Sequence, residues 1–210
     1  MLKIKSKRTA TEATTFDVWE AGYYENLVLK ENFDLDPEEV RQYFEFNNVT
    51  AGLFTVYQRL FNVTFKKVIN PSVWHEDVLM YEVYDGSSNE MIGRFYLDMF
   101  PRANKYGHAA AFSVTMGKMT PDGYQKPATA LVCNFPKPTE FQPSLLTHDN
   151  VETYFHEFGH LVHGVLTQAP LMSYAGTSVA RDFVEAPSQM LENWIWQKES
   201  LSLFAKHYDT

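Results

Sequence analysis

Two histidines and a glutamate lie close together in the segment His156-Glu157-Phe158-Gly159-His160. On an α-helix, residues i and i+4 share one face, so the imidazoles of His156 and His160 can bind one metal ion. Imidazole pairs at this spacing favour Zn²⁺, and the glutamate between them can exchange a proton with an activated water molecule. This chemistry is the metal-assisted hydrolysis of an amide bond.

The residues around these histidines predict a buried helix. Apolar side chains surround most of it, namely Val151, Tyr154, Phe155, Phe158, Leu161, Val162 and Val165, and either Asp149 or Asn150 can cap its start. A polar stripe runs through this apolar surface at Glu152, His156, His160 and His163. Burying such a stripe is costly unless its members are paired or hold a metal ion, so the pattern favours a metal site. We expect His163 to be a buried, hydrogen-bonded residue rather than a further ligand, because catalytic zinc keeps one position open.

A catalytic zinc ion also needs a third protein ligand. A histidine six residues after His160 would complete one common pattern, but Leu166 occupies that position. The other common solution is a glutamate on a later helix, and the sequence offers Glu185 and Glu192.

The segment that carries these two glutamates has the spacing of a helical face. Asp182, Glu185, Gln189 and Glu192 follow one another at intervals of 3, 4 and 3 residues. Pro187 either kinks this helix or marks its first turn, with the earlier residues outside it. Spacing alone therefore leaves the choice between the two glutamates open.

Several motifs resemble the thimet oligopeptidase, neurolysin and oligopeptidase A family of zinc metallopeptidases. The zinc segment Val151–His160 and the segment Asp182–Trp194 carry the resemblance, together with Gly176-Thr177. It continues in Trp74–Val78, Gly93–Asp98, Lys105–Ala110 and Pro143–Leu146. The resemblance is weaker toward Asp17 and covers nearly the whole chain.

The resemblance implies roles for individual residues. His156, His160 and Glu185 would ligate one Zn²⁺ per chain, with Glu157 as general base and acid. This implication selects Glu185 over Glu192 as the third ligand. Zinc-bound histidines usually donate their second N–H to a carboxylate or carbonyl, and Glu152, Asp182 and Glu192 are candidates for that outer role.

The expected function is that of a zinc-dependent metalloendopeptidase acting on short peptides. A peptidyl-dipeptidase of the same family, or a non-catalytic zinc-binding or peptide-binding fragment, is the alternative. An extended peptide can add to an exposed strand edge through main-chain hydrogen bonds, and the strand from Gly107 to Met116 is the candidate edge. His108, in the same segment, is a further candidate for lining the cleft. No substrate-binding side chain is assigned.

The family's members are much longer than 210 residues. We therefore expect this chain to be an incomplete catalytic domain that lacks part of the substrate-binding machinery. Losing one oxyanion donor alone costs roughly 10²–10³ in rate, so the isolated chain is expected to be weakly active or inactive.

Composition excludes several classes of protein. The net charge is −8, and no basic stripe exists to neutralise phosphates, which argues against nucleic-acid binding. A single cysteine, Cys133, rules out an internal disulfide and fits a reducing compartment. No apolar run is long enough to cross a membrane, and no secretory signal is evident. We expect a cytoplasmic monomer.

The order of predicted elements indicates an α+β fold, predominantly helical, with a small sheet packed against the zinc helix and a following glutamate-bearing helix. We divide it into a helical segment (1–62), a small β-sheet region (63–147) and zinc-binding helices (148–210), all parts of one catalytic domain. Helices are expected from about 15 to 30, from Pro37 to about Phe61 with a break near Asn48, and from about Val179 to His207. The sheet is expected to be mainly antiparallel, with a hairpin turn at Asp85–Asn89.

Overall fold

The computed structural model describes residues 1–9 and 11–210 of the chain. Its α-helices are α1 (Leu2–Thr9), α2 (Ala21–Phe33), α3 (Pro37–Val40), α4 (Phe46–Phe61), α5 (His148–Val165), α6 (Ala186–Glu192) and α7 (Lys198–Phe204). Its strands are β1 (Val63–Lys67), β2 (Leu79–Asp85), β3 (Met91–Asp98), β4 (Ala110–Thr115), β5 (Lys118–Thr120), β6 (Gly123–Gln125) and β7 (Ala128–Val132). The α+β class predicted from the sequence is confirmed.

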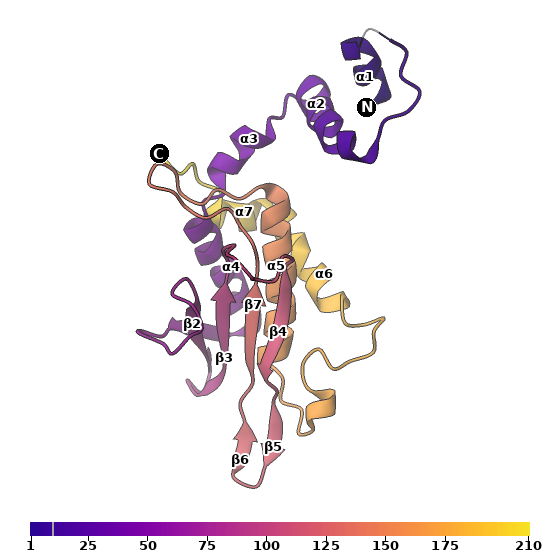
Figure 1. The fold of residues 1–210 in the computed structure, drawn as a ribbon. Helices are drawn as coiled ribbons and strands as arrows, with labels where there is room; N and C mark the ends of the chain where they lie inside the picture. Colours follow the sequence, from indigo (N-terminus) through magenta and orange to yellow (C-terminus); the bar gives the residue numbers. More distant parts are fainter. Residues whose placement is uncertain (10) are drawn as a thin grey trace.

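The main sheet has the strand order β1-β2-β3-β7-β4 (Figure 1). Strands β1, β2 and β3 pair antiparallel, and so do β7 and β4. Strands β3 and β7 pair parallel, so the sheet is mixed, and the expectation of a mainly antiparallel sheet was incomplete. Strand β4 lies at one end of this order, which leaves its outer edge without a partner strand in the described part of the chain.

Strands β5 and β6 form a separate hairpin that the sequence reasoning missed. Pro121 and Asp122 connect them and Gly123 begins β6, and proline, aspartate and glycine are typical turn residues. Gly123 has a φ of 113°, a conformation that disfavours any residue with a side chain. This turn signal was present in the sequence.

The core lies between the sheet and helices α4 and α5. Phe95 of β3 packs edge-on against Phe158 of α5, with ring centroids 5.5 Å apart, and Phe54 of α4 lies 5.7 Å from the same ring. The buried Tyr57 hydroxyl of α4 donates a hydrogen bond of 2.6 Å to the Phe155 carbonyl. These contacts fix the zinc-motif helix firmly against the rest of the molecule.

Two of the predicted helices are interrupted. The first starts at Pro37 as expected, with Asp36 as its N-cap, and breaks at Phe44 and Glu45 rather than near Asn48. The Phe46 N–H there donates to the Ser144 carbonyl, so a tertiary contact replaces helix continuation. The second, predicted to be continuous to His207, is divided into α6, a 3₁₀ turn (Asn193–Trp196) and α7.

Helices α1 and α2 stand apart from the sheet and are joined to it through α3 (Figure 1). An ion pair of 2.6 Å between Lys5 and Glu20 links α1 to the start of α2. Helix α2 confirms the helix expected from about residue 15, although it begins later, and α1 was not predicted. Across the described residues, no helix combines the length and apolar character needed to span a membrane.

Candidate metal centre

Helix α5 begins at a reciprocal cap. Thr147 is the N-cap: its hydroxyl accepts from the Asn150 N–H, and the Asn150 side chain accepts from the Thr147 N–H, both at 3.2 Å. The expectation of Asp149 or Asn150 as the N-cap was therefore wrong, because Asn150 serves at the third helical position instead. The helix is apolar around most of its surface and buried as predicted.

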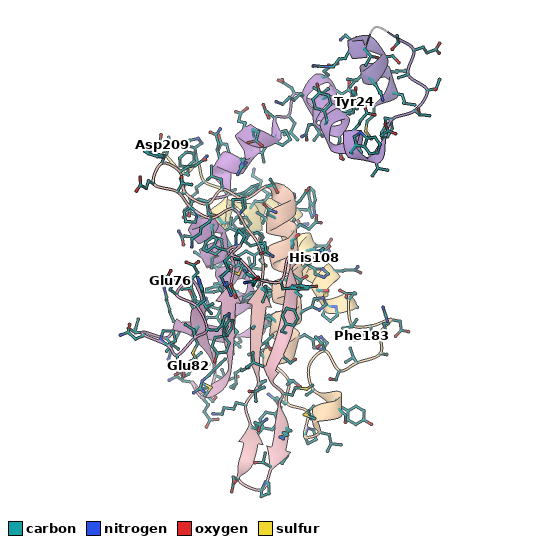
Figure 2. All side chains as sticks on the ribbon, in the orientation of Figure 1. Tyr24, Glu76, Glu82, His108, Phe183 and Asp209 are labelled. Carbon is teal, nitrogen blue, oxygen red and sulfur yellow. The ribbon has the colours of Figure 1, made fainter. Side chains whose placement is uncertain are left out.

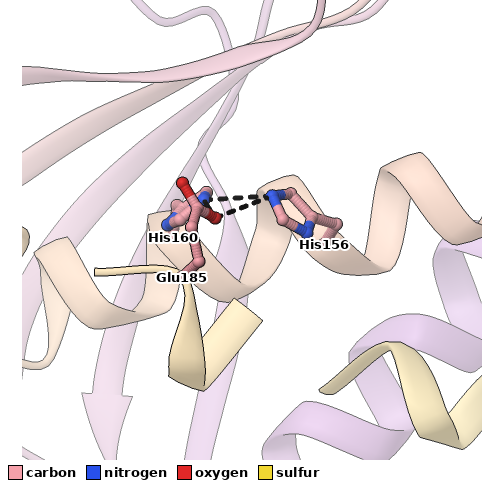
Figure 3. A group of neighbouring side chains, drawn as sticks. All are labelled: His156, His160 and Glu185. Carbon is pink, nitrogen blue, oxygen red and sulfur yellow. Dashed lines mark hydrogen bonds and ion pairs between the residues drawn. The ribbon is translucent and has the colours of Figure 1, made fainter. Parts of the chain in front are cut away.

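The two histidines of α5 and Glu185 bring three donor atoms together (Figure 3). The Nε2 atoms of His156 and His160 lie 3.1 Å apart. Glu185 Oε2 lies 2.9 Å from His160 Nε2 and 3.2 Å from His156 Nε2. Two imidazole nitrogens and one carboxylate oxygen are a donor set that suits Zn²⁺ and leaves a fourth position for water or substrate. The residues present therefore fit a catalytic zinc ion.

Glu185 lies in the turn immediately before α6, not within a helix. Pro187 stands in the first turn of α6, where a missing N–H costs no hydrogen bond. Of the two predicted alternatives, Pro187 therefore marks the first turn of the helix and does not kink it. The Ser188 hydroxyl donates to the Glu185 carbonyl at 2.9 Å and also lies 3.1 Å from its carboxylate. The glutamate is therefore oriented by the helix that follows it.

A glycine allows α5 and α6 to approach closely. A Cβ atom added to Gly159 would lie 2.8 Å from the Cα of Ser188, closer than a real side chain tolerates. Gly159 is the residue immediately before His160, so this contact brings the Glu185 turn toward the histidines. The sequence reasoning gave no role to Gly159 or Ser188, and their small size was the signal.

Glu152, Asp182 and Glu192, the candidates for accepting the second N–H of a histidine, differ in their positions. Glu192 Oε1 lies 2.5 Å from His156 Nδ1, the ring nitrogen that faces away from Glu185. Within the described residues, neither Glu152 nor Asp182 makes a hydrogen bond to either histidine. Asp182 is exposed because the segment before Ala186 is a turn, so the helical face predicted for it does not exist.

Glu157 is half-buried on α5 and lies near β4. Burial raises the pKa of its carboxyl, and the nearby Glu185 charge acts in the same direction. The two histidines and the backbone N–H of Ala111 in β4 oppose this shift without cancelling it. The Glu157 carboxyl therefore lies near both the histidines and strand β4.

The carboxyl of Glu185 is shifted the other way. Burial acts to raise its pKa, but His160, the Ser188 hydrogen bond and His156 outweigh it, so the pKa is lowered. A carboxylate that stays ionised is the form that binds a metal ion. The lowered pKa keeps Glu185 in that form.

His163 lies one turn beyond the donor set. The atom Nδ1 is buried and has no hydrogen-bond partner in the described structure, so the expectation of a hydrogen-bonded histidine was wrong for this atom. Burial, followed by the His160 charge, lowers its pKa, which favours the neutral ring. Apolar neighbours such as Val162 and Leu191 share the same cavity and explain the desolvation.

A metal centre with these ligands, together with an adjacent carboxylate, is typical of metallopeptidases. The model of peptidase family M3 matches residues 1–210, so the chain belongs to this family, as its motifs had indicated.

Over 90% of its length the chain is 45% identical to a thimet-like oligopeptidase of Dictyostelium discoideum, and that match covers 29% of the relative. It is 43% identical to saccharolysin of Saccharomyces cerevisiae over 92% of the chain and 28% of the relative. It is 41% identical to oligopeptidase A of Escherichia coli over 91% of the chain and 28% of the relative. The chain thus spans less than a third of the length of these relatives.

Proposed function

We propose that this chain carries the catalytic centre of a zinc-dependent metalloendopeptidase that hydrolyses short peptides. The observation that supports the proposal most strongly is the convergence of His156, His160 and Glu185, whose donor atoms all lie within 4.8 Å of one another. The names of two relatives, the thimet-like oligopeptidase of Dictyostelium discoideum and oligopeptidase A of Escherichia coli, support the same class of substrate.

In this proposal His156, His160 and Glu185 hold the zinc ion. When bound, the ion would polarise the scissile carbonyl and make the attacking water more acidic. Glu192 accepts the N–H of His156 Nδ1 and thereby fixes the ring so that Nε2 faces Glu185.

Glu157 serves as the proton carrier. As a carboxylate it takes a proton from the attacking water, and it then delivers a proton to the leaving amine. Burial raises its pKa, which makes the second transfer easier than it would be for an exposed carboxylate. A module that only binds zinc has no need of this carboxylate, so its presence favours catalysis over mere binding.

The outer edge of β4 provides a place for the peptide backbone. Its N–H and C=O groups on that side have no partner strand in the described part of the chain. An extended peptide can pair with such an edge through main-chain hydrogen bonds, largely independent of its sequence. Because Ala111 of β4 is near Glu157, a peptide bound there would lie beside the metal centre.

Metal content per chain is the first test. Mass spectrometry of purified protein is expected to find one zinc in the wild type and in Glu157→Gln, and little in His160→Ala. A wild-type chain that binds no zinc after refolding with the metal would refute the proposed ligand set.

Turnover is the second test. Incubation of the zinc-loaded wild type with short synthetic peptides is expected to give slow cleavage at most, in line with the weak activity expected of this chain, and Glu157→Gln is expected to give none. Cleavage at internal bonds indicates an endopeptidase, whereas release of C-terminal dipeptides indicates the peptidyl-dipeptidase alternative. Zinc binding together with the same trace turnover in Glu157→Gln and the wild type would favour the non-catalytic alternative.

A further inference from the structure

An exposed aromatic pair stands at the start of the free sheet edge. Phe112 of β4 is 44% exposed and Tyr106, in the loop before β4, is 51% exposed. Their rings meet edge to face with centroids 5.6 Å apart, and the ring of His108 lies 5.7 Å from that of Tyr106 (Figure 2 labels His108 beside β4). Exposure of large aromatic side chains to water is unfavourable. A cluster of them at one strand edge therefore indicates a binding surface.

The side of the sheet on which this pair lies follows from strand alternation. Ala109 and Ala111 pack against the core. Successive side chains of a strand point to opposite faces, so Phe112 points away from the core. The pair therefore occupies the face opposite the metal-binding helix, beside the same strand edge.

Buried polar contacts hold the loop that carries Tyr106. The Lys105 ammonium, only 3% exposed, donates to the carbonyls of Asp98, Phe100 and Cys133 at 2.8, 2.7 and 2.5 Å. The Asn134 amide donates to the Tyr106 and His108 carbonyls at 2.9 and 3.3 Å. The aromatic surface is therefore formed before any ligand arrives, which reduces the entropy lost on binding.

A peptide paired with β4 must present side chains to both faces. Residues directly opposite each other on neighbouring strands have their Cβ atoms about 4.5–5.5 Å apart, close enough for an aromatic ring to contact the facing side chain. One alternate set of peptide side chains would face the metal centre. The other set would pass over Phe112 and Tyr106.

We propose that Phe112 and Tyr106 form an apolar subsite that selects an aromatic or large aliphatic side chain at one position of a peptide bound along β4. The inference rests on the proposed function, because it takes β4 as the strand that receives the peptide. Selectivity then comes from the face of the sheet remote from the metal, while the backbone pairing stays independent of sequence.

The test measures peptide affinity in the zinc-loaded chain with Glu157→Gln, which prevents turnover. The probes are fluorescently labelled, alanine-rich peptides in which a single Phe, Leu or Glu is placed at each position in turn. Fluorescence anisotropy gives the Kd of each peptide. One position is expected to favour Phe and Leu over Ala by about tenfold, the size of effect that burial of one such side chain provides. Phe112→Ala and Tyr106→Ala should abolish this preference without changing the affinity for the all-alanine peptide, whereas Tyr106→Phe should retain it.

Phe141→Ala is the matched control. Phe141 is 95% exposed in the connector between β7 and α5, and the substitution should leave the preference intact. A preference that survives Phe112→Ala, the absence of any preference, or the absence of peptide binding would each overturn the subsite. Selective peptide binding by a chain whose zinc content does not depend on His160 would instead overturn the proposed function and leave the subsite standing.

Discussion

At the residue scale, the metal centre depends on side chains that orient its ligands. His156 has one ring nitrogen directed at Glu185 and the other hydrogen-bonded to Glu192. A carboxylate in this outer position fixes the tautomer and raises the basicity of the ligating nitrogen. In the proposed zinc site, Glu192 would therefore act on the metal through His156 without touching it.

Replacing Glu192 by alanine should weaken zinc binding by about 10–100-fold, because His156 loses the partner that orients its ring. Competition with a chromogenic chelator measures this affinity. Gln189→Ala, on the exposed surface of the same helix, is the control and should leave the affinity unchanged. Equal affinities in Glu192→Ala and the wild type would show that the hydrogen bond does not support the ligand.

At the element scale, the distance between α5 and α6 sets the position of the third donor. Gly159 on α5 faces Ser188 on α6, and Ser188 in turn bonds to Glu185. Closely packed helices transmit a displacement of one residue to its neighbours, because interiors leave little free space. We therefore expect the geometry of the candidate metal centre to depend on Gly159, although Gly159 has no side chain that could bind the metal.

Gly159→Ala should destabilise the metal-free chain by about 1–3 kcal/mol and also weaken zinc binding, since its Cβ must displace the Ser188 backbone. Urea unfolding and chelator competition measure the two effects. Gly22→Ala in α2 is the matched control, because its Cβ meets nothing within 4 Å. Alanine's higher helix propensity should leave that variant as stable as the wild type or up to about 1 kcal/mol more stable. The interpretation fails if the two variants behave alike.

At the scale of the whole molecule, a buried ionic cluster ties the ends of β3 and β7 to the loop before β4. Asp98 accepts two hydrogen bonds from Arg102 at 2.6 and 2.8 Å and one from the Trp74 indole at 2.8 Å. Lys105 lies 3.0 Å from the same carboxylate. Burial acts to raise the pKa of Asp98, but these donors outweigh it and lower the pKa to about 2.

This cluster predicts a pH dependence of stability. The folded pKa of Asp98 lies below the unfolded value of about 3.9, so its contribution is complete above that value and is lost as the pH falls toward 2. The shift corresponds to about 2 kcal/mol. The free energy of unfolding of the wild type should therefore decline across this range, and Asp98→Asn should be less stable near neutral pH and show a shallower decline.

Asp122→Asn, in the exposed turn between β5 and β6, is the control and should follow the wild-type curve. An Asp98→Asn curve parallel to that of the wild type would mean that the carboxylate gains nothing from its partners.

Local patterns in the sequence were sufficient where the physics is local. Helical periodicity placed His156 and His160 on one face of a buried helix, and the structure has that helix. The helix start expected at Pro37 and the hairpin turn expected at Asp85–Asn89 are both present. Family motifs, rather than spacing, selected Glu185 over Glu192.

Tertiary structure decided what depends on contacts between distant segments. The parallel pairing of β3 with β7 joins strands far apart in the chain, and no periodicity encodes it. Pro187 sets where α6 begins, so the turn before that helix keeps Asp182 away from the site. The contact of Ser188 with Gly159 sets how close α6 lies to α5, and Glu192 is thereby left beside His156. The sequence by itself determined the chemistry that two histidines and a glutamate offer on one helix. Packing decided that Glu192, and neither Glu152 nor Asp182, contacts His156, since side-chain distances across helices follow from the fold as a whole.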